Sequence, residues 1–330
     1  MNFTIGFDRQ DEKKLQGYWS EILENQKWSD GKFTNLFEEK WSKYVGAGSV
    51  AFSSWWTAAM CMIEYYNIKN KTVLVPSNTF MATPLACIKN NNTIKFIDCN
   101  TEDLCMSYKD LVTRIDNDTM AEFEKIKMLF LVHIGGHIAF DIKKIVQWCK
   151  ERNIILVEDC AHAHGASYDG KKAGTFGDCG IYSFYATKTL STGEGGMLVS
   201  KDNNLIEFAR SFRDYGKPEY KIKGINGRMS EFQAAIGCVN TDRLDDIVIW
   251  KNDYAINNLD PIYRSTKLNL PSGMISGLYK YITFSPVTPK STGKVYDEPC
   301  HRILKTNDNL PNTDWVSKNH WCAPLYYKGE

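Results

Sequence analysis

Short apolar runs alternate with amphipathic helical segments over residues 50–157, and this alternation constrains the fold more than any other feature of the sequence. Three of these runs are Thr72–Val75, Lys127–Val132 and Ile154–Val157. They are almost continuously apolar, which is typical of strands buried on both faces. Between the last two runs, Asp141–Arg152 carries its apolar residues at helical spacing. The pattern therefore predicts an α/β fold with a mostly parallel sheet covered by helices.

The composition excludes several classes of protein. Hydrophobic residues make up 43% and charged residues 24% of the 330 residues, which is the ordinary range of soluble globular chains. The net charge of +1 gives no general electrostatic basis for binding nucleic acid or an anionic membrane. Because we find no long uncharged apolar stretch and no signal-peptide core at the N-terminus, we expect neither a membrane span nor a secretory leader.

The cysteines indicate a compartment. Ten cysteines are scattered along the chain without a Cys-x-x-Cys pair, and several lie inside apolar segments. This usage favours buried free thiols in a reducing cytoplasm over a disulfide framework or a zinc site. We therefore predict a cytoplasmic protein without a bound metal.

The chain is long enough for one large domain and one smaller domain. The segment from Met229 to about Lys251 is predicted to be a long helical stretch, and the chain beyond it is richer in Pro, Ser and Gly. One strand is expected there, at Leu278–Phe284. We predict a large domain over residues 1–240, with an N-terminal helical segment, and a smaller C-terminal domain over residues 241–330.

The stretch Ile181–Ser200 holds two apolar runs that flank a Gly-rich turn, and it carries Lys188 near Ser183. A lysine in such a setting loses hydration, which favours the neutral amine and makes it available for Schiff-base chemistry. Taken alone, a lysine in a loop is more often an ordinary surface charge. The interpretation therefore depends on what the neighbouring strand ends supply.

Chemically distinct groups follow the ends of the predicted strands, where ligands of α/β folds bind. The turn Ser53–Thr57 precedes a helix whose free N–H groups suit a phosphate, and Phe80 offers a flat aromatic face. Asp159 and His162 follow another strand, and Lys188 follows the next. Each group alone has a structural interpretation, as a cap, core or turn residue. Together they form the set that holds pyridoxal phosphate, which needs a Schiff-base lysine and an acidic partner for its ring nitrogen.

Over residues 8–250 the chain resembles the DegT/DnrJ/EryC1/StrS family of fold-type I pyridoxal-phosphate enzymes, the sugar aminotransferases. The part between Asp159 and Lys188 is the most specific. The resemblance implies a three-layer large domain with a mostly parallel sheet and a smaller α+β C-terminal domain. The matching segments are SDGKFTNLFEEKWSKYVG (29–46), VPSNTFMAT (75–83), VHIGGHIAFD (132–141), ILVEDCAHAHGA (155–166), AGTFGDCGIYSFYATKTLSTGEGGMLV (173–199) and GINGRMSEFQAAIG (224–237).

The resemblance also implies a role for each matching residue. Lys188 would hold pyridoxal phosphate through its amine and later move protons. Asp159 would keep the pyridine nitrogen protonated, and His162 would lie against the ring hydroxyl. The other implied cofactor contacts are ring stacking by Phe80 and phosphate binding by Trp56, Thr57, Ala58 and Ser183.

The substrates and the partner implied by the resemblance follow the same pattern. Asn226 would reach the cofactor phosphate of a neighbouring subunit, which implies a homodimer with shared active sites. The substrates would be a nucleotide-linked keto-sugar and L-glutamate, used in two successive half-reactions. Residues implied to line the sugar pocket are Trp28, Ser29, His320 and Tyr326.

Two departures from the family pattern stand out. The family usually has Ser-Gly-Thr at the phosphate turn, where this chain has Trp55-Trp56. Either the turn has a different backbone conformation or an indole shapes the site. The chain also stops earlier than is typical of the family, so we expect a terminal helical segment of the small domain to be missing.

Three other functions stay open at this stage. Related pyridoxamine-dependent sugar dehydratases carry histidine at the position of Lys188, so the lysine argues against that activity. An amino-acid aminotransferase would bind a substrate carboxylate through an arginine, for which Arg264 and Arg302 are candidates outside any motif. A non-catalytic protein that keeps the fold for binding is disfavoured by the complete set of cofactor residues.

Overall fold

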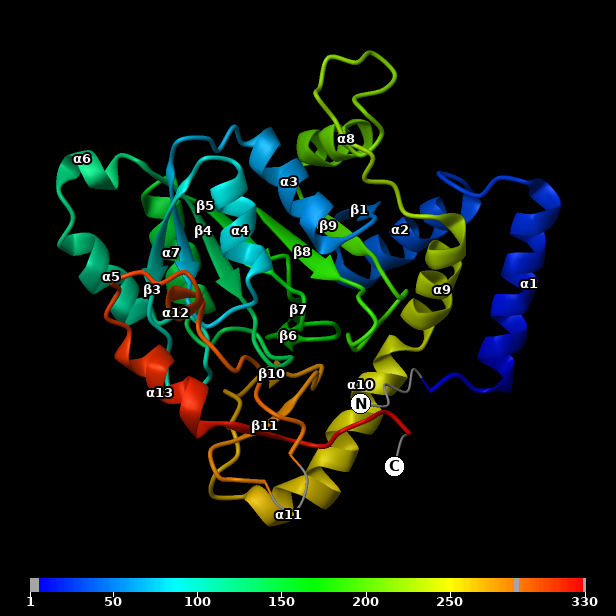
Figure 1. Ribbon diagram of the computed structural model, residues 1–330. Coiled ribbons are helices and arrows are strands. Elements are labelled where there is room, and N and C mark those ends of the chain that lie inside the picture. The colour runs from blue at the N-terminus through cyan, green and yellow to red at the C-terminus, as the bar shows by residue number, and fades with distance from the viewer. Residues whose placement is uncertain (1–5, 288–290, 329–330) are drawn as a thin grey trace.

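The computed structural model describes residues 6–287 and 291–328, which form an α/β structure around a seven-stranded sheet (Figure 1). The strand order is β1-β9-β8-β5-β4-β2-β3, and β9 runs antiparallel to both of its neighbours while the pairs from β8 to β3 are parallel. The predicted mostly parallel sheet is confirmed. The strands are β1 (Gly48–Phe52), β2 (Thr72–Pro76), β3 (Thr93–Ile97), β4 (Ile126–Val132), β5 (Ile155–Asp159), β8 (Cys179–Ser183) and β9 (Gly196–Ser200).

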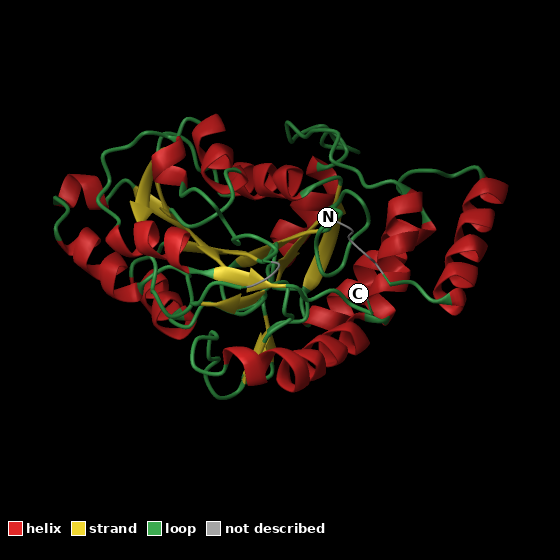
Figure 2. Cartoon of the chain, turned by 60° about the horizontal axis from the view of Figure 1, so that its bottom comes forward, coloured by secondary structure: helices red, strands yellow, loops and turns green. Residues whose placement is uncertain are grey.

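Helices cover both faces of this sheet, and Figure 2 shows the strands enclosed between them. The first apolar cluster receives side chains from α1 (Arg9–Asn25), α2 (Lys32–Val45), α5 (Tyr108–Asp116), α7 (Ile142–Glu151), α9 (Glu231–Asp242) and α10 (Leu244–Tyr254). The second cluster receives them from α3 (Trp55–Tyr65), α4 (Ala82–Lys89), α8 (Asn203–Phe212) and α12 (Cys300–Ile303). The sheet and its two helical coverings make the three layers that were predicted.

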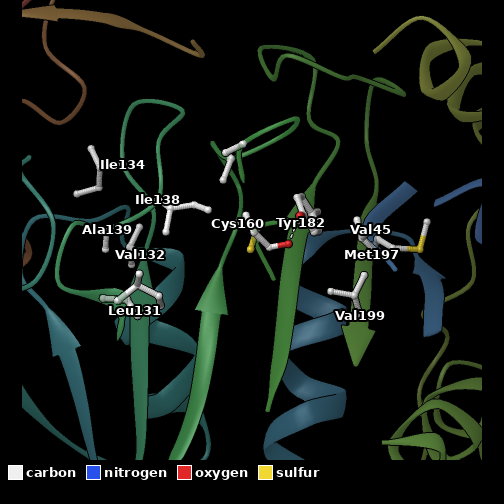
Figure 3. Close-up of a cluster of buried hydrophobic side chains, with 14 of the residues drawn as sticks. Val45, Leu131, Val132, Ile134, Ile138, Ala139, Cys160, Tyr182, Met197 and Val199 are labelled. Carbon is white, nitrogen blue, oxygen red and sulfur yellow. Dashed lines mark hydrogen bonds between the residues drawn. The ribbon is translucent and has the colours of Figure 1, made fainter. Parts of the chain in front are cut away.

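Alternation of side chains along each strand explains why the sheet carries two clusters. In β4, Leu129 and Leu131 belong to the first cluster, whereas Met128 and Phe130 belong to the second. Figure 3 shows part of the first cluster, in which Leu131 and Tyr182 of β8 lie on the same face of the sheet. Because both faces are buried, the strands are apolar throughout, as the sequence pattern indicated.

The C-terminal region departs from the sequence prediction in its details. The strand expected at residues 278–284 is shorter, since β11 (Tyr281–Thr283) pairs with β12 (Trp321–Ala323). The long helical stretch is two helices, because Arg243 leaves helical geometry between α9 and α10. The remaining elements are α6 (Met120–Phe123), β6 (Ser167–Tyr168), β7 (Lys171–Lys172), η1 (Ala255–Leu259), α11 (Asp260–Tyr263), β10 (Met274–Ile275) and α13 (Pro311–Asn319).

The expected domain boundary at residue 240 falls inside α9. Chain segments beyond that boundary contact the sheet-bearing part directly. β10 pairs with β6, and the backbone N–H of Cys300 donates to the Ser77 carbonyl oxygen at 2.9 Å, just beyond β2. These contacts place the C-terminal region against the strand ends where the candidate site lies.

All ten cysteines are free and buried, as the sequence predicts. Burial raises the pKa of the Cys149 and Cys238 thiols to about 12 and holds the pKa of Cys160 well above its ordinary value. The thiols are therefore protonated and packed as apolar side chains. No helix among residues 6–287 and 291–328 is long and apolar enough to cross a lipid bilayer.

Candidate active site

A cavity with room of about 360 Å³ opens at the carboxyl ends of the central strands, and we name it the main cavity. Six of the residues that the sequence singles out line it together: Trp56, Phe80, Asp159, His162, Ser183 and Lys188. They come from four segments of the chain, so the sheet topology brings them to one place. Lys188 lies on the loop between β8 and β9, as the two apolar runs around the Gly-rich turn predict.

Asp159 is the last residue of β5 and is nearly completely buried. Its carboxylate accepts a hydrogen bond from the Thr83 hydroxyl at 2.9 Å and another from the Ala161 backbone N–H at 3.1 Å. Burial raises the pKa of this carboxyl, while the two hydrogen bonds and the Lys188 amine act in the opposite direction. Asp159 is thus a fixed carboxylate with room left to bind a cationic or protonated group in the main cavity.

Glu158 precedes Asp159 on the strand and serves a different purpose. Its carboxylate accepts from the backbone N–H groups of Gly174, Phe176 and Gly177 at 2.6–2.8 Å and lies 2.8 Å from Nε2 of His133. Ligand atoms of His133, Glu158 and Cys160 lie within 4.8 Å of one another, but the carboxylate is already fully hydrogen-bonded. We therefore interpret Glu158 as the structural anchor of the loop before β8.

Lys188 is held in the loop by a hydrogen bond from its backbone N–H to the Tyr185 carbonyl oxygen at 2.9 Å. Its Nζ lies 5.1 Å from the centre of the Tyr279 ring. Burial lowers the pKa of this amine to about 8; Asp159 opposes the decrease and Lys280 adds to it. A substantial fraction of the amine is therefore neutral near pH 8, which is the form that reacts with a carbonyl.

His162 is buried and lies in a stack of aromatic rings. Its ring centre is 4.2 Å from that of Tyr279 and 5.6 Å from that of Tyr296, with small interplanar angles. Burial, followed by the nearby Lys188 charge, holds the pKa of His162 well below its ordinary value, so the ring is neutral. Its Nδ1 is buried without a hydrogen-bond partner among the residues that the structure describes. A ligand group with hydrogen-bonding capacity would satisfy this nitrogen.

Tyr279 is a site residue that the sequence analysis missed. Its ring contacts His162 on one side and the Lys188 amine on another, and its hydroxyl lies 3.2 Å from the Thr187 hydroxyl. It comes from the C-terminal region, far from the matching motifs in sequence. No pattern around residue 279 indicates that it reaches the strand ends.

The loop after β4 explains how Tyr279 is held there. The backbone N–H of Gly277 donates to Gly136 and that of Lys280 donates to Gly135, both at 2.8 Å. Gly136 has φ of +114°, and a Cβ on it would lie 2.4 Å from the Tyr279 nitrogen. Only glycine permits this close approach of two backbones. The Gly-Gly pair in the sequence was a visible sign of the contact, although it did not identify the partner.

The start of α3 has ordinary capped geometry despite its two tryptophans. The Ser54 side chain accepts from the Thr57 N–H at 3.2 Å, and the Ala58 N–H donates to the Ser54 carbonyl oxygen at 3.3 Å. Thr57 and Ala58, both expected to hold the phosphate, are therefore occupied within the helix and do not line the main cavity. Its wall is formed instead by Ser54, Trp55 and Trp56. The cap is thus the usual one, and the indoles shape the cavity.

The residues expected in the sugar pocket are not brought together in this chain. Trp28 is 53% exposed with its ring edge against Phe232, and neither Trp28 nor Ser29 lines the main cavity. The prediction for His320 needs correction, because its ring is completely buried. Its Nδ1 donates to the Val316 carbonyl oxygen and its Nε2 accepts from the Val295 N–H, so no ring nitrogen is left for a substrate.

Tyr326 and Asn226 also lie outside the main cavity. Tyr326 lines a second, smaller cavity that shares Lys188 with the first. Asn226 is exposed and lies beside Asp214 in an isolated bridge. Neither Arg264 nor Arg302 lines either cavity, and Arg302 pairs with Asp314 at 3.0 Å.

Known protein sequences resemble the sequence of this chain. The sequence model of the DegT/DnrJ/EryC1/StrS aminotransferase family matches residues 9–258. The chain belongs to this family. Over 275 residues it is 31% identical to a GDP-perosamine synthase of Escherichia coli O157:H7, with 77% of this chain and 71% of that protein covered. It is also 31% identical over 326 residues to a dTDP-3-amino-3,4,6-trideoxy-alpha-D-glucose transaminase of Micromonospora megalomicea subsp. nigra, covering 90% and 85%.

Solved structures confirm the fold class. A DegT DnrJ EryC1 StrS aminotransferase from Brucella abortus has a TM-score of 0.90 to this chain at 23% identity, covering 99% of this chain and 95% of that one. The predicted family and the α/β fold are therefore confirmed. At the level of the family, the predicted enzyme class and the predicted cofactor, pyridoxal phosphate, are confirmed as well.

The residues around the main cavity fit this cofactor on their own chemistry. Lys188 offers an amine with a lowered pKa, and Asp159 offers a buried carboxylate for a ring nitrogen. Nδ1 of His162 and Nε1 of Trp55 are buried without hydrogen-bond partners in the described part of the chain. The first N–H groups of α3 supply the positive end of a helix for a phosphate.

Proposed function

We propose that this protein is a pyridoxal-phosphate-dependent aminotransferase that transfers an amino group from L-glutamate to a nucleotide-linked keto-sugar. The reaction would serve amino-sugar biosynthesis for a surface polysaccharide or glycoconjugate. The observation that carries the proposal is the buried Lys188 amine, which lines one cavity with Asp159 and His162. The two relatives described above, a perosamine synthase and a dTDP-amino-sugar transaminase, support the substrate class.

The chain's own residues supply the proton chemistry. Pyridoxal phosphate, when bound, provides the electron sink that stabilises a carbanion next to nitrogen. The Lys188 amine accepts a proton from the substrate carbon and returns it, which its lowered pKa permits near neutral pH. Asp159 keeps a ring nitrogen protonated, since a buried carboxylate interacts strongly with a nearby positive charge. The ring of Tyr279 lies beside the amine, with its centre 5.1 Å from Nζ.

The assembly that we propose is a homodimer with shared active sites. The segment between α8 and α9 projects from the rest of the molecule (Figure 1), and Asn226, which belongs to this segment, is exposed and lies outside the main cavity of its own chain. At the main cavity, the ring of Phe80 is 67% exposed and that of Tyr185 is also exposed, which favours cover by a second copy. We keep residue 240 as the proposed domain boundary. The ten buried thiols support a reducing cytoplasmic location.

Mixing two variants tests the sharing of sites. Lys188→Ala and Asn226→Ala chains would each have low activity alone. If Asn226 serves the neighbouring subunit, mixed dimers contain one intact site, so the mixture exceeds the sum of the two variants. Light scattering gives the oligomeric state independently. A monomer, or a mixture with no gain, would contradict the dimer.

The function itself is tested with the protein loaded with pyridoxal phosphate. Glutamate added without a sugar should change the visible absorbance of the bound cofactor and release 2-oxoglutarate. A panel of nucleotide-linked keto-sugars, read by mass spectrometry, should then contain an acceptor that gains an amino group. Amination of 2-oxo acids instead would favour the amino-acid aminotransferase. If no amino donor changed the absorbance, the non-catalytic alternative would replace our proposal.

A further inference from the structure

The second cavity, with room of about 70 Å³, meets the main cavity at Lys188. Thr187, Lys188 and Tyr279 line both. The other walls come from α10, from the segment before β11 and from the C-terminal strand and the residues after it. We name it the lysine pocket after Lys188, Lys251 and Lys280, which all line it.

The lysine pocket itself offers its three amines no carboxylate, since no aspartate or glutamate is among its described lining residues. Of the described carboxylates, only that of Asp159, from the main cavity, opposes the charge of Lys188. Lys251 is only 6% exposed, and its Nζ donates to the neutral carbonyl oxygen of Leu278 at 3.1 Å. Among the described residues, none of the three amines lies within 4.0 Å of a carboxylate. Burial, followed by the charge of Lys280, lowers the pKa of Lys251 to about 8. Uncompensated buried cations are costly and are normally paired.

One hydroxyl group in the lining also suits an anion. Oγ1 of Thr189 is buried and has no hydrogen-bond partner in the described part of the chain. Thr187, Ser191 and Thr292 line the same pocket, but the hydroxyls of Ser191 and Thr292 already donate to the carbonyl oxygens of Phe184 and Cys322. The donors left for an oxyanion are therefore the ammonium groups and the Thr189 hydroxyl.

The size of the pocket limits the anion. A water molecule needs roughly 10–15 Å³ on the same measure, so 70 Å³ holds a carboxylate group with room to spare. A nucleotide does not fit, since ligand sites of drug-like size run to several hundred Å³. The pocket therefore favours the carboxylate of a small acid over the diphosphate of a nucleotide-linked sugar.

We propose that the lysine pocket binds a carboxylate group of the amino donor, with Lys251 and Lys280 as its charged ligands. This inference rests on the proposed function, because it assigns a place to the glutamate of that reaction. Lys188 lines both cavities, so a donor whose amine reacts beside Lys188 has its carboxylates only a few bonds from the lysine pocket. Lys251 and Lys280 are positioned to select an acidic donor over a neutral one.

Glutarate is the direct probe, since it has the carbon chain and both carboxylates of glutamate but no amine to react. Calorimetry on the protein loaded with pyridoxal phosphate gives the Kd of glutarate. We expect Lys280→Gln and Lys251→Met each to raise this Kd at least tenfold and to raise the KM for glutamate in parallel. The matched control is Lys201→Gln, which alters an exposed lysine outside both cavities and should change neither value more than twofold.

A second arm separates the two sources of oxyanion. The Kd values of dTDP, UDP and GDP should stay within twofold of wild type in both lysine variants. The inference is overturned if the variants bind glutarate as tightly as wild type, or if they lose nucleotide affinity instead. Lys280 is only half-buried, so Lys280→Gln keeps the test decisive if Lys251→Met fails to fold. Glutarate binding needs no sugar, so a protein that binds it through these lysines but aminates no sugar would contradict the proposed function alone.

Discussion

The two cavities that meet at Lys188 differ in how their charges are balanced. In the main cavity the carboxylate of Asp159 opposes the Lys188 charge, and Thr83 and Ala161 hold that carboxylate in place. In the lysine pocket three amines face hydroxyls and a neutral carbonyl oxygen. We assign the main cavity to the cofactor, which stays bound. We assign the lysine pocket to the carboxylate of the amino donor, which binds and leaves in each catalytic cycle. Because Lys188 lines both cavities, an anion bound in the lysine pocket would change the electrostatic potential at the reactive Lys188 amine.

The strongest test of this comparison removes the shared residue. We expect Lys188→Ala to lower turnover by about 10⁴-fold or more, because no other described amine lines the main cavity. Stopped-flow measurement of product formation gives the rate, and the visible absorbance of bound pyridoxal phosphate should change in the same variant. Lys280→Gln is the comparison variant, and it should keep that absorbance. Full turnover by Lys188→Ala would refute the assigned role.

The adjacent carboxylates of Asp159 and Glu158 have different assigned roles: Asp159 acts in the chemistry of the site, and Glu158 stabilises the fold. Asp159→Asn should retain the fold and lose at least about 10²-fold in turnover, since an amide cannot keep a ring nitrogen protonated. Glu158→Gln should instead lower the free energy of unfolding by about 3–5 kcal/mol, because three backbone N–H groups and His133 lose their buried charge partner. Urea unfolding and steady-state kinetics on both variants measure the two effects. If Asp159→Asn were the unstable variant, the assignment of the two carboxylates would be reversed.

The pH dependence of Lys188 measures the coupling between the two cavities. With its pKa at about 8, the amine in cofactor-free protein should react faster with a small acylating reagent as the pH rises, with half of the full rate at about pH 8 and a plateau at higher pH. Lys280→Gln removes a positive neighbour and should move this midpoint upward. Peptide mass spectrometry follows the modification, with exposed Lys201 as the internal control. An unchanged midpoint would show that Lys280 does not act on Lys188.

The same lowered pKa has a consequence for stability, and its sign can be stated. An unfolded lysine titrates near 10.4, so between pH 8 and about 10.4 the unfolded chain binds more protons than the folded one. Lys188 and Lys251 therefore make the folded protein more stable as the pH rises through this window. Thermal unfolding of Lys251→Met should show a smaller rise over the same range.

The smallest expected effect concerns the wall between the cavities. Tyr279→Phe removes the hydroxyl that contacts Thr187 but keeps the ring against His162 and the Lys188 amine. The loss of one neutral hydrogen bond corresponds to about 0.5–1.5 kcal/mol, so kcat/KM for glutamate should fall by no more than about tenfold. Tyr279→Ala, which also removes the ring, should cost more. Equal losses in the two variants would mean that the hydroxyl alone matters.

The sequence points to the residues at the strand ends that line the main cavity but not to those of the C-terminal segment, and the reason is physical. Asp159, His162 and Lys188 follow buried strands directly, so their positions depend on local pattern and sheet order. Tyr279 and Lys280 reach the site only because the backbone of their segment lies on Gly135 and Gly136, a contact between residues more than 140 positions apart. No local periodicity reports such a contact.

Differences between the predicted and the observed surroundings of single residues have similar causes. The resemblance implies that Thr57 and Ala58 belong to the turn that holds the phosphate, but their N–H groups donate to the side chain and the carbonyl oxygen of Ser54. His320 lies among C-terminal residues expected at a sugar pocket, yet its two nitrogens bind Val295 and Val316. Hydrogen-bond satisfaction is a property of the folded chain, so it could not be read from residue types alone.

Because all ten cysteines are buried, their labelling by a thiol reagent would report which parts of the protein have opened. A thiol reagent in solution meets no accessible thiolate while the structure is closed, since each cysteine is packed and protonated. Cys61, Cys87 and Cys300 belong to one apolar cluster, whereas Cys105, Cys149 and Cys322 belong to the other. The order in which they become labelled under mild denaturation would show which layer separates from the sheet first, without any engineered probe.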